Sequence, residues 1–159
     1  MHIPELFCPF PADVHPSATT VDAATIVWSQ QFQLIPHNRY HPLQALHIGW
    51  LAARTHPQAH LTGVQLVADW CAWLFLHDDV CDESPLATQP EQLRHWHQHL
   101  SAVMAGERSP TQAGMIAAFA DLWERTCGTP SASPDWVERF RNHIEQFFEA
   151  TSWEAAHRA

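Results

Sequence analysis

The sequence predicts an all-α protein with a single domain, and three observations lead to that prediction. Apolar residues recur at the three- and four-residue spacing of helices along most of the chain, whereas no segment alternates as a strand does. Most of the 12 prolines stand between these helical segments, where they separate one from the next. A length of 159 residues suits one domain and is enough to bury a core.

The N-terminal third is expected to contain an arm and two helices. Residues 1–16 are too rich in proline for a helix or a central strand, so we expect an extended arm laid over the body. Helical spacing then covers residues 17–34, which Pro36 stops, and residues 42–54, which Pro57 closes.

Four further helices are expected in the remainder, so that residues 17–159 form one helical domain. The third covers residues 58–80 and spans roughly 33 Å at about 1.5 Å per residue, with Ser84-Pro85 ending it. The other three helices cover residues 91–105, 111–126 and 134–158. Glycines end the first two of them, and a Pro-Asp pair starts the last.

The charge and the cysteines exclude several classes of function. The net charge is −9 and all eight basic residues are arginines, which argues against binding nucleic acid or an anionic membrane surface. No apolar run is long enough to span a membrane, and the first 20 residues lack the pattern of a signal peptide. The four cysteines form no Cys-x-x-Cys pair, so we expect reduced thiols in a cytoplasmic protein.

The third expected helix carries the most informative pattern of the sequence, because its apolar run ends in four acidic residues. Asp78 and Asp82 are four residues apart and share a face, while Asp79 and Glu83 form a second such pair. The face of Asp78 continues backwards as an apolar stripe: Phe75, Leu74, Cys71, Trp70 and Val67. A helix C-terminus disfavours negative charge, so this concentration of carboxylates is locally unfavourable.

The acidic turn is either a solvated helix end or a site for Mg²⁺. It is often merely a solvated helix end, but the preceding helix is apolar almost all round and is expected to be buried. Carboxylate oxygens suit Mg²⁺, which favours sites that it shares with substrate phosphates. A metal-bound diphosphate above an apolar wall would fit a long hydrocarbon with a diphosphate head.

Four segments resemble the bacterial class I terpene synthases (terpene cyclases). Residues 69–83, Asp-Trp-x-x-Trp-x-Phe-x-x-Asp-Asp-x-x-Asp-Glu, are similar to the family's helix with the aspartate-rich DDxxD motif. Residues 8–16 resemble its N-terminal signature, and residues 51–59 the segment that leads into the motif helix. Arg139, followed by Trp153-Glu154-x-x-x-Arg158, resembles a later helix of the family.

The resemblance implies a mechanism and a role for each site residue. Three Mg²⁺ ions would bridge the aspartates and the substrate diphosphate, after which the ionised hydrocarbon cyclises in a dry, aromatic-lined cavity. Asp78 would bind metal directly. One of Asp79 and Asp82 would be a second metal ligand, and the other would accept a hydrogen bond from a diphosphate-sensing arginine. Which residue takes which role is left open, and Glu83 is a further candidate ligand. Val67, Trp70, Cys71, Leu74 and Phe75 would contact the substrate, for which farnesyl diphosphate is the expectation.

The sequence also departs from the family. The family is roughly twice as long, and nothing here matches its second metal motif (NDxxSxxxE), its diphosphate-sensing arginine or its C-terminal Arg-Tyr pair. We therefore expect a chain truncated before the second metal motif and incomplete for catalysis alone, which self-associates or pairs with a complementary C-terminal half. The alternatives are a non-catalytic half and, less favoured, an isoprenyl diphosphate synthase, since that class uses two DDxxD motifs.

Several other residues were considered as sites. His77 precedes the acidic motif, and packing is favoured there over metal binding. His95 and His99 have a spacing that can bind Zn²⁺, but no third ligand is evident. Glu154 and Arg158 are expected to form an ion pair that braces the site. The last helix carries an apolar stripe that we interpret mainly as core: Trp136, Phe140, Ile144, Phe147, Phe148 and Thr151.

Overall fold

The computed structural model describes residues 7, 12–34, 44–109 and 111–158, and its regular structure there is entirely helical. The prediction of an all-α fold is thereby confirmed. The elements are α1 (Ala18–Gln31), α3 (Ile48–Thr55), α4 (Leu61–Glu83), the 3₁₀ helix η2 (Pro85–Thr88), α5 (Pro90–Met104), α6 (Met115–Cys127) and α7 (Pro134–Arg158).

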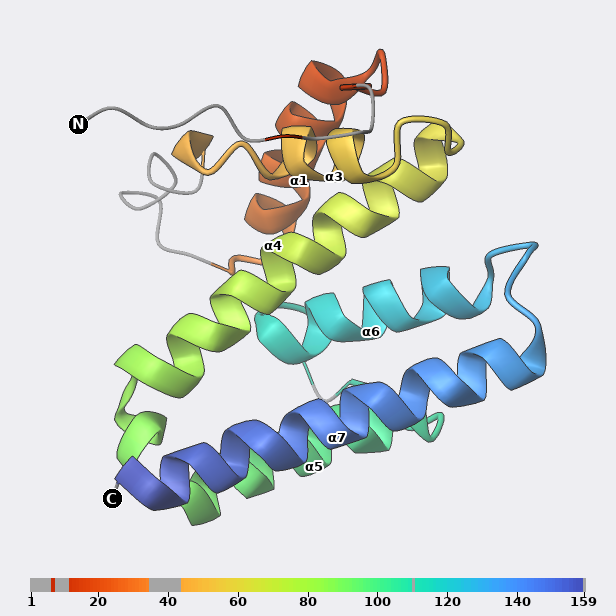
Figure 1. Cartoon of the computed structure of the whole chain (residues 1–159). Coiled ribbons are helices and arrows are strands. Elements are labelled where there is room, and N and C mark those ends of the chain that lie inside the picture. The colour runs from red at the N-terminus through yellow and green to blue at the C-terminus, as the bar shows by residue number, and fades with distance from the viewer. Residues whose placement is uncertain (1–6, 8–11, 35–43, 110, 159) are drawn as a thin grey trace.

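Helix α4 runs diagonally through the molecule and connects two groups of helices (Figure 1). Its N-terminal half packs against α1 and α3, and its middle packs against α6. Helices α5 and α7 lie side by side in opposite directions, and α7 ends close to the C-terminal end of α4. Two segments far apart in sequence therefore meet where the acidic residues lie.

The end of α4 follows from a local sequence signal. Ser84 is extended, and its hydroxyl accepts the Leu86 N–H at 3.1 Å, which caps η2. Pro85 occupies the first position of η2, where a missing N–H costs nothing. The helix extends to Glu83, so the whole acidic turn is helical and the expected end at residue 80 was three residues early.

An aromatic core fixes α4 against α6 and α7. Trp73 is fully buried, and its indole N–H donates to the Met115 carbonyl at 2.9 Å. Trp70 donates its indole N–H to Thr126 Oγ1 at 2.9 Å and packs edge-on against Phe119 and Phe140. Because both indole donors are satisfied, these large rings are buried without loss of a hydrogen bond.

A buried ion pair ties α1, α4 and α6 together at the other end. Asp69, which is 1% exposed, accepts hydrogen bonds from Thr25 and Gln65 and from the Arg125 guanidinium, each at 2.8 Å. Burial raises the pKa of Asp69, while the charge and hydrogen bond of Arg125 act in the opposite direction. The carboxylate is thus held by three partners on three helices.

The second expected helix, over residues 42–54, is not continuous. Residues 35–43 lie outside the described part of the chain, and His47 adopts a left-handed conformation (φ 49°) before α3 starts at Ile48. This break brings Gly49 against α1, where its N–H donates to Asp22 at 2.8 Å and a Cβ would lie 2.2 Å from the Asp22 nitrogen. Tertiary contact, rather than local spacing, sets the start of α3.

Three other boundaries differ from those expected by three or four residues. Helix α1 ends at Gln31, not at residue 34, α4 begins at Leu61, not at residue 58, and α6 begins at Met115, not at residue 111. Gly114 has φ 84° and donates its N–H to the Phe32 carbonyl at 2.6 Å, so the chain turns there before α6 starts. Of the expected arm, only residues 7 and 12–16 lie within the described part, and they are not helical.

No helix in the described part of the chain has the length and apolar character needed to cross a membrane.

Candidate metal and substrate site

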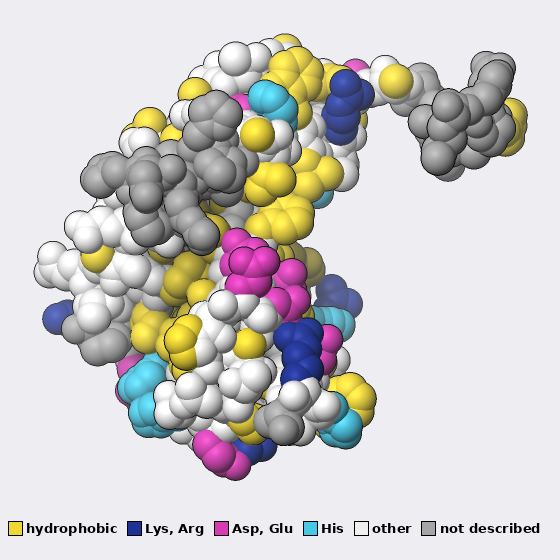
Figure 2. Space-filling view, turned by 90° about the vertical axis from the view of Figure 1, so that its left-hand side faces the viewer, with side chains coloured by type: hydrophobic (Ala, Val, Ile, Leu, Met, Phe, Trp, Pro, Cys, Tyr) yellow, Lys and Arg dark blue, Asp and Glu magenta, His cyan; other side chains and the backbone are white. Residues whose placement is uncertain are grey.

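The four acidic residues form the last turn of α4 and are all exposed. Figure 2 shows a group of acidic side chains in the middle of the face where α4 ends, between hydrophobic side chains and a basic one. Partial burial, then the negative charges of Asp82, Asp79 and Glu154, raise the pKa of Asp78, while Arg158 acts in the opposite direction. The site is therefore one where an added cation would relieve repulsion.

Arg158, from the last turn of α7, is the basic group that closes one side of the acidic turn. It donates to the carboxylates of Asp82 and Glu154 and, at 3.4 Å, to the carbonyl of Cys81. The expected pair of Glu154 and Arg158 is present, at 2.7 Å. The sequence did not predict that Asp82 also pairs with Arg158, because the two residues lie 76 positions apart.

The apolar stripe of α4 lines a cavity of about 540 Å³ between α4 and α7. Val67, Trp70, Cys71 and Leu74 contribute to its wall, as expected, and Asp78 lies one turn beyond Leu74 on the same helix. Phe75 is not in this wall, and 47% of its surface is exposed. The structure thus brings four of the five expected substrate contacts together and leaves the fifth outside.

Helix α7 supplies the opposite wall. Trp136, Phe140 and Ile144 line the cavity, whereas Phe148 is buried in the core with 3% exposure. Trp136 stacks on Phe140 at 5.2 Å, and Phe140 packs edge-on against Trp70 at 5.4 Å. The stripe that we interpreted mainly as core therefore divides into a cavity-lining half and a core half.

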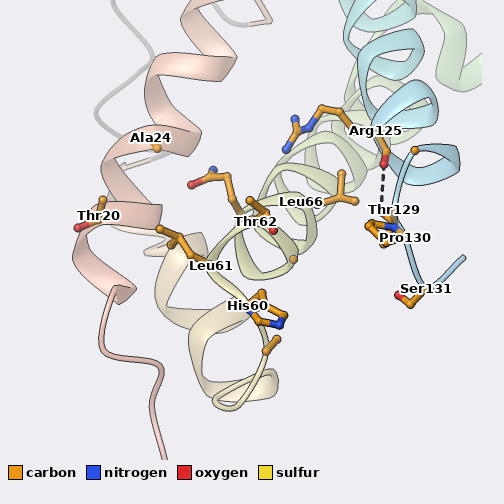
Figure 3. A pocket seen from close by; sticks show the side chains of 14 residues that line it. Thr20, Ala24, His60, Leu61, Thr62, Leu66, Arg125, Thr129, Pro130 and Ser131 are labelled. Carbon is orange, nitrogen blue, oxygen red and sulfur yellow. Dashed lines mark hydrogen bonds between the residues drawn. The ribbon is translucent and has the colours of Figure 1, made fainter.

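A second, larger cavity of about 1170 Å³ lies between α1, the start of α4 and the α6–α7 connection (Figure 3). Arg125 stands in its wall, but its guanidinium is bonded to Asp69 and Asp121, and its carbonyl accepts from Thr129 at 3.0 Å. This cation is already neutralised and is a poor anchor for a diphosphate. The smaller cavity is the better candidate, because Leu74 in its wall lies one helical turn before Asp78.

The family of the chain follows from a direct comparison. The model of the family described as "Terpene synthase family 2, C-terminal metal binding" matches residues 69–159, which begin within α4 and include the acidic turn. The chain belongs to this terpene synthase family. The resemblance drawn from the motifs is thereby confirmed.

Curated relatives of this terpene synthase chain agree with that assignment. It is 34% identical over 154 residues to the (+)-T-muurolol synthase ((2E,6E)-farnesyl diphosphate cyclizing) of Roseiflexus castenholzii, covering 96% of this chain and 47% of the relative. It is 30% identical to the germacrene A synthase of Nostoc punctiforme, covering 98% and 48%. The chain spans about half the length of the curated relatives it matches.

Solved structures share the fold. The SVS_A2 protein from ancestral sequence reconstruction superposes with a TM-score of 0.83 at 21% identity, over 98% of this chain and 48% of that one. Wild-type cucumene synthase superposes with a TM-score of 0.78 at 22% identity, over 94% and 51%. The helices described above are therefore arranged as in about half of a terpene synthase.

Proposed function

We propose that this chain provides the aspartate-rich half of a Mg²⁺-dependent sesquiterpene cyclase that acts on farnesyl diphosphate. The observation that carries the proposal is that the acidic turn follows, on the same helix α4, the residues that line an aromatic cavity, with Leu74 in the wall and Asp78 one turn later. The proposed substrate is supported by the printed activity of the relative that is 34% identical.

The residues of the turn fit Mg²⁺. They are carboxylates, the hard oxygen donors that this ion prefers, and partial burial, followed by repulsion from neighbouring carboxylates, already raises the pKa of Asp78. Asp78 and Asp79 would hold Mg²⁺ with Glu83 as a further candidate ligand, while Asp82 is bonded to Arg158. When bound, Mg²⁺ acts as a Lewis acid toward the leaving diphosphate.

The chain's own residues perform the remaining tasks. The wall formed by Val67, Cys71 and Leu74 holds the hydrocarbon and excludes water, which would otherwise quench a carbocation. The rings of Trp70 and Phe140 present aromatic surface, which stabilises positive charge. Arg158 orients Asp82 and thereby the last turn of α4.

The isolated chain is proposed to be incomplete for catalysis. It carries a net charge of −9, and two of its arginines, Arg125 in the wall of the larger cavity and Arg158 beside the acidic turn, are already paired with carboxylates. A diphosphate bound through metal at the acidic turn would lack a positive group on its other side to offset its charge. The curated relatives contain a further half that could supply it.

The test compares the chain alone with a fusion to the remaining half of the Roseiflexus castenholzii relative. Each protein is incubated with farnesyl diphosphate and Mg²⁺, and the products are identified by gas chromatography with mass spectrometry. We expect a cyclic sesquiterpene from the fusion and none from the chain alone. A folded fusion without product would argue against the function, and product from the monomeric chain would argue against the incompleteness.

The isoprenyl diphosphate synthase alternative gains no support, because the relatives named above are cyclases.

A further inference from the structure

Two histidines and a cysteine meet inside the helical core, directly behind the acidic turn. His77 and Cys81 lie one helical turn apart on α4, and His97 reaches them from α5. Their exposures are 0%, 3% and 4%, and one ligand atom from each lies within 4.8 Å of the others. None of these three residues has a part in the function proposed above.

Hydrogen bonds already orient the two imidazoles. His97 Nδ1 lies 2.9 Å from Ser152 Oγ on α7, and His97 Nε2 lies 3.0 Å from His77 Nε2. A neutral His97 that donates its Nδ1–H to Ser152 presents a bare Nε2 lone pair towards His77. Metal-binding histidines are held in this way, with the outer nitrogen donating to an oxygen.

The surroundings keep both rings neutral. His77 packs against Trp73, Trp96 and Phe147 with ring centroids 4.9–5.3 Å apart. Both rings are buried in this apolar surrounding, which disfavours a charged imidazolium. Neutral imidazole is the form that binds a metal ion, so no proton has to leave these rings on binding.

We propose that His77, Cys81 and His97 form a Zn²⁺ site that is separate from the acidic turn. Two imidazole nitrogens and a thiolate are donors that Zn²⁺ prefers, whereas Mg²⁺ selects carboxylate oxygen. The Cys81 sulfur lies 3.6 Å and 3.8 Å from the two ring nitrogens of His77. The ion would replace the hydrogen that the two Nε2 atoms share, and it would lie to one side of the line between them, because their separation of 3.0 Å is less than two Zn–N bonds of about 2.0–2.1 Å.

Only small movements of the side chains are needed. Two nitrogens bound to one tetrahedral Zn²⁺ lie about 3.3 Å apart, against 3.0 Å here. The sulfur has to turn about its Cα–Cβ bond towards the gap between the rings. With three protein ligands, the site would resemble those zinc sites in which a further, non-protein ligand completes the coordination.

Binding of the ion changes the protonation of Cys81 and the position of the proton on His77. Cys81 loses its thiol proton to solvent when the ion binds, and the single N–H of His77 moves from Nε2 to Nδ1, which lies 3.6 Å from the sulfur. Cys81 is buried with 3% exposure, so without a metal ion it is held as the neutral thiol. One proton is therefore released per ion.

The experiment uses Co²⁺ as a spectroscopic substitute for Zn²⁺. The whole chain is reduced, stripped of metal with a chelator, and titrated with Co²⁺ in the presence of excess Mg²⁺, which occupies the carboxylates. We expect a cobalt–thiolate absorption band that saturates at one ion per chain and disappears on addition of Zn²⁺. Proton release is followed with an indicator dye in weak buffer.

Variants separate this site from its neighbours. Cys81→Ser is expected to abolish the thiolate band, and His97→Gln to weaken binding at least tenfold. Ser152→Ala, which removes the partner of His97, is expected to weaken binding by about 10- to 100-fold. Cys127→Ser, at an exposed cysteine, and Asp78→Asn, in the acidic turn, are expected to leave the band unchanged.

The outcomes decide the proposal without any assay of catalysis. Circular dichroism first verifies that each variant is folded, and Zn²⁺ is expected to raise the melting temperature of the parent chain but not of Cys81→Ser. If folded parent chain gives no thiolate band, or if the band survives Cys81→Ser, the cluster is a hydrogen-bonded core network and the proposal is wrong. Loss of the band in Asp78→Asn as well would show that the ion is shared with the acidic turn, and would equally overturn the proposal of a separate site.

Discussion

At the scale of single residues, the carboxylates of the acidic turn are not equivalent. Asp82 is neutralised by Arg158, whereas the carboxyl of Asp78 experiences burial and three negative neighbours, and its pKa is raised. An acid whose pKa is raised on folding binds protons more readily in the folded state. Its contribution to stability therefore falls as the pH rises through that pKa, and it is unfavourable at neutral pH.

Asp78→Asn tests the effect of this charge on stability and on metal binding. The melting temperature without metal is expected to rise slightly at pH 7, and the rise is expected to vanish below about pH 3.9, where aspartate is protonated even in the unfolded chain. Binding of Mn²⁺, measured by electron paramagnetic resonance, is expected to weaken at least tenfold, because a ligand charge is lost. Asp135→Asn, at the start of α7, is the control. Unchanged Mn²⁺ affinity would show that Asp78 is not a ligand.

Arg158→Met removes the positive charge beside the same turn. Because Arg158 opposes the negative neighbours of Asp78, its loss is expected to tighten Mn²⁺ binding a few-fold in the isolated chain. In the active fusion the same change is expected to lower turnover, since Asp82 is no longer oriented. Arg94→Met, which breaks an exposed pair with Glu91 on α5, is the control. Weaker Mn²⁺ binding would mean that Arg158 organises the ligands rather than competing with Mn²⁺ for them.

At the scale of elements, sequence spacing predicted the helices well where they are amphipathic and bounded by proline or glycine. Helix α7 has the expected bounds of 134 and 158, since Pro134-Asp135 is a strong start signal. The bounds of α3 and α6 could not be predicted, because Gly49 and Gly114 make contacts with α1 and with Phe32 that local spacing does not contain.

Gly49→Ala and Gly63→Ala form a matched pair that tests the contact between α3 and α1. A Cβ at Gly49 would meet backbone atoms of Asp22 at 2.2 Å and 2.4 Å, so the two helices must separate. We expect a loss of about 1–3 kcal/mol in the free energy of unfolding, as for other overpacked sites. At Gly63 nothing lies within 4 Å, and alanine is expected to stabilise α4 by up to about 1 kcal/mol. Urea unfolding measures both, and equal effects would contradict the close approach.

Arg125→Met tests the ion pair that joins α1, α4 and α6. It leaves the Asp69 carboxylate buried without its cation, which is expected to cost about 3 kcal/mol at pH 7 and to raise the pKa of Asp69 further. Because protonation then relieves the buried charge, the loss relative to the parent chain is expected to shrink as the pH falls towards 5. Urea unfolding at both pH values checks this. A loss that does not depend on pH would indicate lost packing of the arginine side chain instead.

At the scale of the whole molecule, the sequence predicted which face of α4 lines the cavity but not what lies opposite. The i, i+4 spacing placed Trp70, Leu74 and Asp78 in order along one helix, and the structure keeps that order beside the cavity. The partners of this face come from α7, through Phe140 and Arg158. These long-range pairings depend on how α5 and α7 pack together, which no local pattern specifies.

Exposed aromatic side chains on α4 and α7, together called the open face, lead to the last prediction, which concerns association of the chain. Trp136 and Phe75 expose 40% and 47% of their surfaces, although tryptophan and phenylalanine are usually well buried. Apolar surface of this kind usually marks a contact site, so we expect the isolated chain to self-associate, and a complementary C-terminal half to displace that association.

Size-exclusion chromatography with light scattering measures the mass of the chain at several concentrations, alone and with the separately produced remaining half of the Roseiflexus castenholzii relative. Trp136→Ser is expected to shift the chain towards the monomer and to weaken its pairing with the added half. Val27→Ser, which changes an exposed apolar residue on α1 far from the cavity wall in sequence, is the control. If the parent chain stays monomeric at every concentration and does not bind the added half, the open face is not a contact surface. In that case, the aromatic wall has to be stable in water without a partner, because Trp136 stacks on Phe140 and Phe140 packs edge-on against Trp70.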